Sequence, residues 1–242
     1  MPGFANLRDV GGYRIGATAT ARWRSLLRAD MPHEPVDLRA LADVPVGTVI
    51  DLREDDEALE TASVFVERGF HVVRRPVFGG TAESFVSRRV RLTELYTHVV
   101  TACAPGLTDA VRAIADAEAS SAVLVHCTAG KDRTGLTVAL ALRAVGVDRR
   151  DVVSDYVATE ARLRGPWRDR RLAELEEHHG ADLSGSSQLL FGSPGHAFDH
   201  ALDLDRHRRS HPHRRQRSPL HRRPVRGACR PGRGSRRDRR PH

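Results

Sequence analysis

The chain has 242 residues, a formal net charge of +8 and an apolar content of 40%. This length is enough for one α/β domain with a substantial core, and the apolar content is ordinary for a domain that folds in water. No stretch approaches the roughly 18 consecutive apolar residues of a membrane span, and no signal peptide follows Met1. These features make the cytoplasm the expected compartment, with export that needs no signal peptide as the alternative.

Cysteine usage points away from a metal centre and from a disulfide framework. The three cysteines, Cys103, Cys127 and Cys229, include no pair at the spacing of metal ligands. The histidine pair His178-His179 lacks accompanying ligands at helical or hairpin spacing. We therefore expect no metal and no cofactor, and a reducing compartment that would suit a catalytic thiol.

The apolar pattern predicts short strands that alternate with helices. The expected strands are residues 46–51, 71–76 and 122–126. The expected helices are residues 58–68, 107–118, 135–145 and 148–162. This alternation predicts an α/β fold with a central, mainly parallel sheet flanked by helices.

The periodicity of residues 81–105 predicts a further helical segment. Arginines occupy positions 88, 89 and 91, and apolar residues recur at 85, 92, 95, 96, 99 and 100. Periodicity alone fits two arrangements equally well. The segment is either an ordinary amphipathic helix packed on the sheet, or a lid over a functional site whose arginines face an anionic ligand or water.

Residues 126–135 read His-Cys-Thr-Ala-Gly-Lys-Asp-Arg-Thr-Gly and join the last predicted strand to a helix. Unpaired N–H groups and the macrodipole make a helix N-terminus a natural anion site. Backbone donors from Thr128 to Arg133 would surround a phosphate group. Gly130 allows backbone angles that a Cβ forbids, and Ala129 is small enough for close approach. The loop is therefore predicted to bind phosphate through Thr128, Ala129, Gly130, Lys131, Arg133 and Thr134.

The side chains of this loop also predict a reaction. The helix dipole, the amide donors, Lys131 and Arg133 all favour the thiolate form of Cys127, which could then attack phosphorus without a separate base. The planar fork of Arg133 can hold two phosphate oxygens into the transition state. The Thr134 hydroxyl can assist departure of the thiolate, and His126 is expected to orient the loop rather than act as a base.

Phosphoryl transfer also needs a carboxyl group that protonates the leaving oxygen and later activates water. The candidates are Asp132, Asp51 and Asp55, of which Asp132 lies inside the loop and is preferred. The alternative interpretation is a buried structural cysteine followed by a capped turn. It would require several residue types to coincide by chance at fixed offsets.

The order His-Cys, five residues, then Arg and Thr resembles the signature of the cysteine-based protein tyrosine phosphatase superfamily. The version Ala-Gly-Lys-Asp-Arg-Thr-Gly is similar to that of the bacterial PtpB-type atypical tyrosine and lipid phosphatases. The resemblance implies a single-domain tyrosine-phosphatase-like fold, with the phosphate loop between a strand and a helix. Lys131 also resembles a residue of phosphoinositide phosphatases, which widens the implied substrates beyond phosphotyrosine and suggests dual specificity.

Further segments extend the resemblance over residues 4–163. They are residues 6–13, 24–25, 49–53 and 155–159. The resemblance implies that Arg8 and Asp9 neighbour the phosphate loop and that Asp51 and Arg53 lie at a strand end. Salt-bridged turn and cap residues are an equally good interpretation of these four side chains.

The superfamily commonly carries its general acid on a separate mobile loop, as an aspartate after a strand that precedes the nucleophile. The matching stretch, residues 72–80, contains no aspartate. This absence strengthens Asp132, which the PtpB-type resemblance also implies as the acid. The same resemblance supports helices within residues 81–105 that shield the cysteine.

The composition changes abruptly at the C-terminus. Residues 206–242 hold 15 arginines, five histidines and five prolines against one acidic residue, Asp238, whereas residues 1–205 hold 24 basic and 30 acidic residues. Such a segment cannot build a core. We therefore expect a catalytic domain over residues 1–204 and a disordered tail over 205–242.

Two interpretations of this tail remain. It is either an arginine-rich arm for nucleic acid or anionic lipid, or an out-of-frame translation of GC-rich DNA. The second is favoured, because residues 194–204 resemble the start of the C-terminal helix of the PtpB-type family before the pattern collapses. Nucleic acid is therefore not an expected partner.

Taken as a whole, the sequence predicts a phosphatase that hydrolyses phosphate monoesters through a cysteinyl-phosphate, with phosphotyrosine proteins as the leading substrates. The alternatives are a phosphoinositide phosphatase and a catalytically weak phosphate-binding module. The oligomeric state and the physiological substrate stay open.

Overall fold

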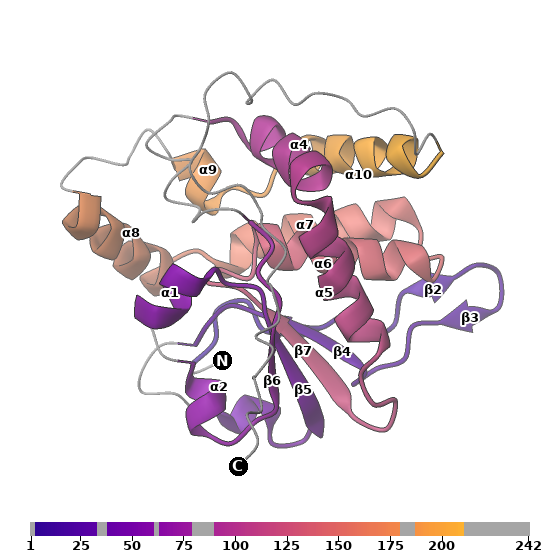
Figure 1. Cartoon of the computed structure of the whole chain (residues 1–242), viewed down its shortest axis with the longest axis horizontal. Coiled ribbons are helices and arrows are strands. Elements are labelled where there is room, and N and C mark those ends of the chain that lie inside the picture. The colour runs from indigo at the N-terminus through magenta and orange to yellow at the C-terminus, as the bar shows by residue number, and fades with distance from the viewer. Residues whose placement is uncertain (1–2, 33–37, 61–62, 79–89, 180–186, 211–242) are drawn as a thin grey trace, which may run out of the picture.

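The computed structural model describes residues 3–32, 38–60, 63–78, 90–179 and 187–210. At its centre lies a five-stranded sheet in the order β1-β4-β7-β5-β6 (Figure 1). The strands are β1 (Arg8–Asp9), β4 (Leu26–Ala29), β5 (Val46–Asp51), β6 (Val72–Arg74) and β7 (Ala122–His126). Of these five, β1 pairs antiparallel and the others pair in parallel. The predicted α/β fold with a mainly parallel central sheet is confirmed.

The predicted strands differ in how well their bounds match. Both β5 and β7 have the expected bounds, and the sheet buries all of β7 and the last three residues of β5. The third strand, β6, is shorter than the expected residues 71–76. The N–H of Arg75 still donates to the Asp51 carbonyl at 2.8 Å, but Pro76 has no N–H with which to continue the ladder.

Both faces of the sheet are covered, as the alternation of side chains along β7 shows. Val123 and Val125 belong to one apolar cluster, whereas Ala122 and Leu124 belong to another on the opposite face. The first cluster is completed by α4 (Leu92–Ala102), α5 (Ala104–Ala115), α6 (Asp132–Ala144), α7 (Arg149–Arg162) and α10 (Gly195–Ser210). The second is completed by N-terminal residues, a short 3-10 helix (Leu38–Leu41) and α2 (Val64–Glu67).

The prediction of a single helix over residues 58–68 is wrong. The structure has two short helices, α1 (Asp55–Glu60) and α2. Ser63 has an extended backbone between them, with φ −79° and ψ 111°. This break lets Val64 and Phe65 turn into the second apolar cluster, so burial outweighs continuation of the helix.

Some elements were not predicted. β1 and β4 are short and carry Arg8 and Arg28, which pattern reasoning assigns to the surface. A small hairpin of β2 (Arg14–Ile15) and β3 (Ala19–Thr20) also escaped prediction. So did α8 (Pro166–His179) and α9 (Ser187–Phe191), which lie on the same side of the molecule as α1 in Figure 1.

The C-terminal helix α10 crosses the domain boundary expected at residue 204. It continues to Ser210 and buries Ala197, Phe198 and Ala201 against the first apolar cluster. Arg149 of α7 forms ion pairs with two aspartates of α10, Asp199 and Asp203. Residues 211–242, which hold most of the predicted tail, lie outside the described residues. None of the helices in the described ranges is both long and apolar enough to span a membrane.

Candidate active site

The loop of residues 127–131 joins β7 to the N-terminus of α6, at the carboxyl edge of the parallel strands. Gly130 has a positive φ of 66°. A Cβ at this position would lie 2.3 Å from the Ala29 carbonyl oxygen and 2.7 Å from the Asp30 nitrogen, so β4 leaves room for glycine alone. The close approach of β4 therefore helps to set the curvature of the loop.

Hydrogen bonds to its carbonyls hold the loop from behind. The Asn6 amide donates at 3.0 Å to the carbonyls of both Ala129 and Gly130. The Arg28 guanidinium donates to the Gly130 carbonyl at 2.7 Å. With the carbonyls engaged on this side, the amide N–H groups of the loop can face the opposite side.

A buried ion-pair network anchors these supporting side chains. Asp155 of α7 pairs with both Arg28 and Arg8, and Arg8 also donates to the Asn6 carbonyl and side chain. Burial alone would raise the pKa of Asp155, but the two guanidinium groups lower it. Arg8 thus contacts the side chain of Asn6, which holds the loop. Asp9 accepts hydrogen bonds from the N–H groups of Gly11 and Arg24 in a turn.

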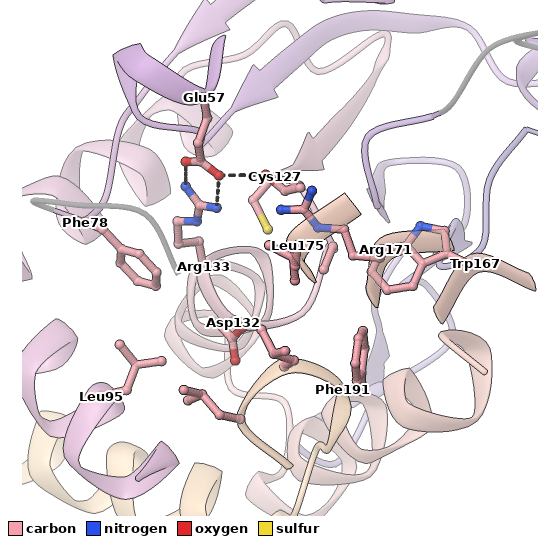
Figure 2. A pocket seen from close by; sticks show the side chains of 14 residues that line it. Glu57, Phe78, Leu95, Cys127, Asp132, Arg133, Trp167, Arg171, Leu175 and Phe191 are labelled. Atoms are coloured by element: carbon pink, nitrogen blue, oxygen red, sulfur yellow. Dashed lines mark hydrogen bonds and ion pairs between the residues drawn. The ribbon is translucent and has the colours of Figure 1, made fainter. Parts of the chain in front are cut away.

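At the mouth of the loop, Arg133 forms a bidentate ion pair with Glu57 of α1 (Figure 2). Both terminal nitrogens of the guanidinium contact the carboxylate, which also accepts a hydrogen bond from Thr128 at 2.7 Å. The guanidinium lies 4.9 Å from the centre of the Phe78 ring. This geometry fixes the plane of Arg133 beside Cys127.

The opposite charges of Glu57 and Arg133 keep both side chains ionised. Burial alone would raise the pKa of Glu57, but Arg133 and the hydrogen bond from Thr128 lower it to about 2. Burial alone would lower the pKa of Arg133, but Glu57 raises it above its ordinary value. Both groups are therefore charged at any physiological pH.

Replacing Glu57 by glutamine should lower the free energy of unfolding at neutral pH by roughly 3 kcal/mol, since it leaves a buried guanidinium uncompensated. The pKa of Glu57 is about 2 in the folded protein, against an ordinary 4.5. Its carboxylate thus contributes stability above about pH 4.5 that is lost as the pH falls toward about 2. Urea unfolding over this range should show the difference between wild type and variant shrinking with acidity.

Asp55→Asn supplies the control for that experiment. Asp55 lies on the same helix but is exposed and pairs at the surface with Arg74, so its loss should change stability little and without this trend. A Glu57→Gln difference that is as large at about pH 3 as at pH 7 would contradict the assigned ion pair.

Asp132 is the first residue of α6 and its side chain is 12% exposed. The Tyr96 hydroxyl of α4 donates to its Oδ1 at 2.6 Å, and the Lys131 ammonium lies 3.5 Å from the same oxygen. Asp132 lines a pocket together with Cys127. The other two candidate acids do not line it, since Asp51 is buried against Arg53 and Asp55 lies at the surface.

Lys131 is not among the residues that line this pocket. Its buried ammonium donates to the carbonyls of Leu189 and Gly192, at the C-terminal end of α9. Carbonyls at a helix end lack intrahelical partners, and an ammonium satisfies them well. Burial lowers the pKa of Lys131, and Asp132 beside it opposes that shift. The sequence predicted that this ammonium would bind the substrate, whereas in the structure it contacts the end of α9.

Four of the predicted residues, His126, Asp51, Arg53 and Thr134, do not line the pocket. His126 is fully buried, with Nδ1 3.2 Å from the Cys127 carbonyl oxygen, and burial lowers the pKa of its ring. Asp51 at the end of β5 pairs with Arg53 at 2.8 Å, and the pKa of Asp51 is lowered by His126 and Arg53 against the effect of burial. Thr134 is buried, and its hydroxyl has no hydrogen-bond partner among the described residues.

The pocket is walled mainly by apolar side chains on both sides of Cys127 (Figure 2). Its charged members are Glu57, Asp132, Arg133 and Arg171. The others are Phe78, Leu95, Cys127, Thr128, Ala129, Trp167, Leu175, Leu189, Leu190 and Phe191. Leu95 belongs to α4, so the part of residues 81–105 that the structure describes borders the pocket, while residues 79–89 lie outside the description.

Sequence reasoning missed several residues of this site. Glu57 carried a weak signal, since it lies in an acidic helix start four residues after Arg53. Asn6 belongs to the segment of residues 6–13 that extends the resemblance, but nothing in the sequence indicates its contact with the loop. The walls from α8 and α9 gave no signal, because their residues are far from the loop in sequence.

Within the described ranges, no group of three His, Cys, Asp or Glu residues is placed to hold a metal ion.

The chain is similar to known proteins. The model of the Tyrosine phosphatase family matches residues 1–210. A Cupriavidus necator protein with a tyrosine-protein phosphatase name is 29% identical over 171 residues, which cover 65% of this chain and 61% of that protein. Triple specificity protein phosphatase PtpB of Mycobacterium tuberculosis is 54% identical over 53 residues, 22% of this chain and 18% of PtpB. The crystal structure of PTPMT1 in complex with PI(5)P aligns with a TM-score of 0.40 at 18% identity, covering 65% of this chain and 96% of PTPMT1.

The two sequence relatives are matched over less than two thirds of their own length. The family model, in contrast, extends from the N-terminus through α10 and thus includes the sheet, the loop and every described wall of the pocket. The superfamily resemblance carried by residues 126–135 is confirmed. The chain belongs to the tyrosine phosphatase family.

Proposed function

We propose that the protein is a metal-independent phosphatase that hydrolyses phosphotyrosine through a cysteinyl-phosphate on Cys127. One observation carries the proposal. Cys127 lines a pocket at the N-terminus of α6, next to a guanidinium whose plane is fixed by Glu57. A dianion in this pocket would meet backbone donors, the positive end of a helix dipole and Arg133 together.

The ion pair with Glu57 supports a phosphate-binding role for Arg133. The carboxylate occupies the end of the guanidinium, where it contacts both terminal nitrogens. Nε–H and the second N–H of Nη2 remain on the adjacent edge, and they form a second parallel fork for two phosphate oxygens. One guanidinium can therefore be held by protein and bind phosphate at the same time.

In the proposed reaction, the Cys127 thiolate attacks phosphorus and forms an S–P bond while the bond from phosphorus to the tyrosyl oxygen breaks. Asp132 gives its proton to that oxygen, and tyrosine leaves. The Asp132 carboxylate then takes a proton from a water molecule whose oxygen attacks phosphorus. The S–P bond breaks, which releases inorganic phosphate and restores the thiolate.

The wall chemistry favours an aryl phosphate over a phosphoinositide. Phe78, Leu95 and Phe191 offer apolar contacts that suit an aromatic ring. The described charged lining consists of two carboxylates and two guanidiniums, so it offers no surplus of positive charge for additional ring phosphates. The relative named triple specificity protein phosphatase PtpB nevertheless makes breadth of substrate a question to measure.

A substrate panel with purified protein tests this proposal. We expect turnover of p-nitrophenyl phosphate and of a phosphotyrosine peptide in the presence of a chelator, inhibition by vanadate, and slower turnover of a phosphoinositide. Faster turnover of the phosphoinositide would assign the rival lipid activity instead. Tight phosphate binding without turnover of any substrate would leave only a phosphate-binding module.

Replacing Lys131 by methionine separates a structural role from a substrate contact. Because the ammonium holds the end of α9, we expect a lower melting temperature and equal fractional losses of kcat/KM on the phosphotyrosine peptide and the phosphoinositide. Lys131 is the only lysine of the chain, so an arginine at this position makes an informative second variant. A loss confined to the phosphoinositide would show that the ammonium reaches the substrate.

A further inference from the structure

The contacts of the Asp132 carboxylate with other described residues involve one of its two oxygens. Tyr96 donates to Oδ1 at 2.6 Å, and the Lys131 ammonium lies 3.5 Å from that same atom. Within the described part of the chain, no side chain or backbone group pairs with Oδ2, which is also not among the buried side-chain atoms that lack a partner. One oxygen is therefore tethered while the other can face the pocket that Asp132 lines.

Tyr96 is well placed to hold that oxygen. It is fully buried on α4, and burial, Asp132 and Tyr156 together raise its pKa well above 10, so its hydroxyl keeps its proton. The Tyr96 hydroxyl donates this proton in its hydrogen bond to Asp132. The Tyr156 hydroxyl lies 2.5 Å from the Tyr96 oxygen and can donate to it, which polarises the Tyr96 hydroxyl toward Asp132.

Aromatic packing fixes the two tyrosines. The Tyr156 ring stacks on Phe198 of α10 with centroids 3.9 Å apart and planes at 4°. The Tyr96 ring meets the edges of both, at 6.0 Å from Tyr156 and 5.9 Å from Phe198. Three helices thus meet beside Asp132, and the side chain that contacts it comes from α4.

We propose that Tyr96 is a positioning residue for the reaction, which ties down Oδ1 of Asp132 so that Oδ2 carries the proton to the leaving oxygen. This proposal rests on the proposed function. In the first step the proton passes from Oδ2 to the departing oxygen as the S–P bond forms and the P–O bond breaks. In the second step Oδ2 takes a proton from the attacking water. Tyr96 keeps its own proton throughout.

The dependence of rate on the leaving group isolates this role. Phenolate is a strong base that needs protonation as it departs, whereas p-nitrophenolate is a much weaker base. We expect Tyr96→Phe to lower kcat/KM for phenyl phosphate by about 10- to 100-fold and to lower it far less for p-nitrophenyl phosphate. Asp132→Asn should show the same pattern with a larger difference.

The chain provides a matched control, because its third tyrosine, Tyr13, contacts Asp155 and not Asp132. Tyr13→Phe should leave the ratio of the two substrates unchanged, whatever it does to both rates. Equal losses on both substrates in a Tyr96→Phe variant that melts as the wild type does, or no loss, would overturn the positioning role. An Asp132→Asn variant without leaving-group dependence would overturn it as well.

These results remain distinguishable from failure of the proposed function. A wild-type protein that turns over neither substrate would refute the phosphatase activity itself and the role of Tyr96 with it. An active wild type with an inactive Cys127→Ser variant, but no selective loss in Tyr96→Phe, would preserve the phosphatase and remove only the positioning role. Thermal melting of each variant shows whether a loss on both substrates reflects unfolding.

Discussion

Replacement of Cys127 by serine should abolish turnover, by a factor on the order of 10⁴ or more, while phosphate or vanadate still binds. A serine hydroxyl at the N-terminus of α6 stays protonated at neutral pH, and the described pocket places no neutral histidine beside it to act as a base. His126 is buried behind the loop and faces the Cys127 carbonyl instead. The binding groups, which are backbone amides and Arg133, remain intact in the variant.

Initial rates on p-nitrophenyl phosphate, together with calorimetric titration of vanadate, measure the two effects separately. Cys103 offers the matched control, since it is also a buried cysteine but lies at the junction of α4 and α5. Cys103→Ser should retain most of the activity. Release of phosphate by Cys127→Ser at the native rate would refute the assigned nucleophile.

Replacement of Arg133 by lysine should lower kcat/KM by about 10²- to 10³-fold, comparable to the loss of a transition-state donor in other enzymes. A guanidinium can hold Glu57 with its end and phosphate with its edge, but an ammonium has no second fork. The lysine would stay with the Glu57 carboxylate, because that pair is buried. Phosphate would then lose its bidentate partner.

Arg171→Lys is the informative comparison, because Arg171 also brings a guanidinium to the pocket but comes from α8. Its guanidinium pairs with Glu174 on its own helix at 3.2 Å, in contrast to the buried bidentate pair that orients Arg133. We expect a smaller loss, mainly in KM. Equal kinetics of wild type and Arg133→Lys would show that bidentate recognition by Arg133 is not needed.

The loop itself could be predicted in detail because its chemistry is local. The spacing of Cys127 and Arg133, the glycine between them and the start of the following helix are all contained in ten consecutive residues. β7 could be predicted for a similar reason, since a strand buried on both faces appears as an apolar run, here Ala-Val-Leu-Val before His126. Both predictions need no knowledge of distant parts of the chain.

The partners of the loop could not be predicted, because they are set by the tertiary fold. Glu57 reaches Arg133 across 76 positions of sequence, and Asn6 reaches Gly130 across 124. The same limit explains why the contacts of Lys131 could not be predicted. From sequence it is a cation in a phosphate loop, but α9 places two unpaired carbonyls within its reach, and the ammonium turns toward them.

The helix predicted over residues 58–68 failed for a different physical reason. The helix was predicted to continue through this stretch, but Phe65 packs against Phe4, Phe70 and His126 in the second cluster. Reaching them requires the break at Ser63. Tertiary burial outweighs helix propensity here because a few tenths of a kcal/mol per residue cannot offset the loss of a buried aromatic side chain.

The C-terminal helix connects the fold to the predicted chemistry. Residues 194–204 were expected to begin a helix that then lost its pattern, and the structure continues α10 to Ser210. Phe198 of this helix stacks on Tyr156, which contacts Tyr96 and thereby Asp132. The buried face of α10 is therefore part of the setting of the proposed acid.

The central claim is the covalent intermediate on Cys127, and rapid acid quenching tests it most directly. Wild-type protein would be mixed with excess p-nitrophenyl phosphate, quenched within milliseconds and digested for mass spectrometry. The account predicts a phosphoryl group on the peptide that contains Cys127, absent from Cys127→Ser and accumulated when Asp132→Asn slows its hydrolysis. Catalytic turnover with no phosphoryl group on Cys127 at any time point, or with the group on another residue, would contradict it.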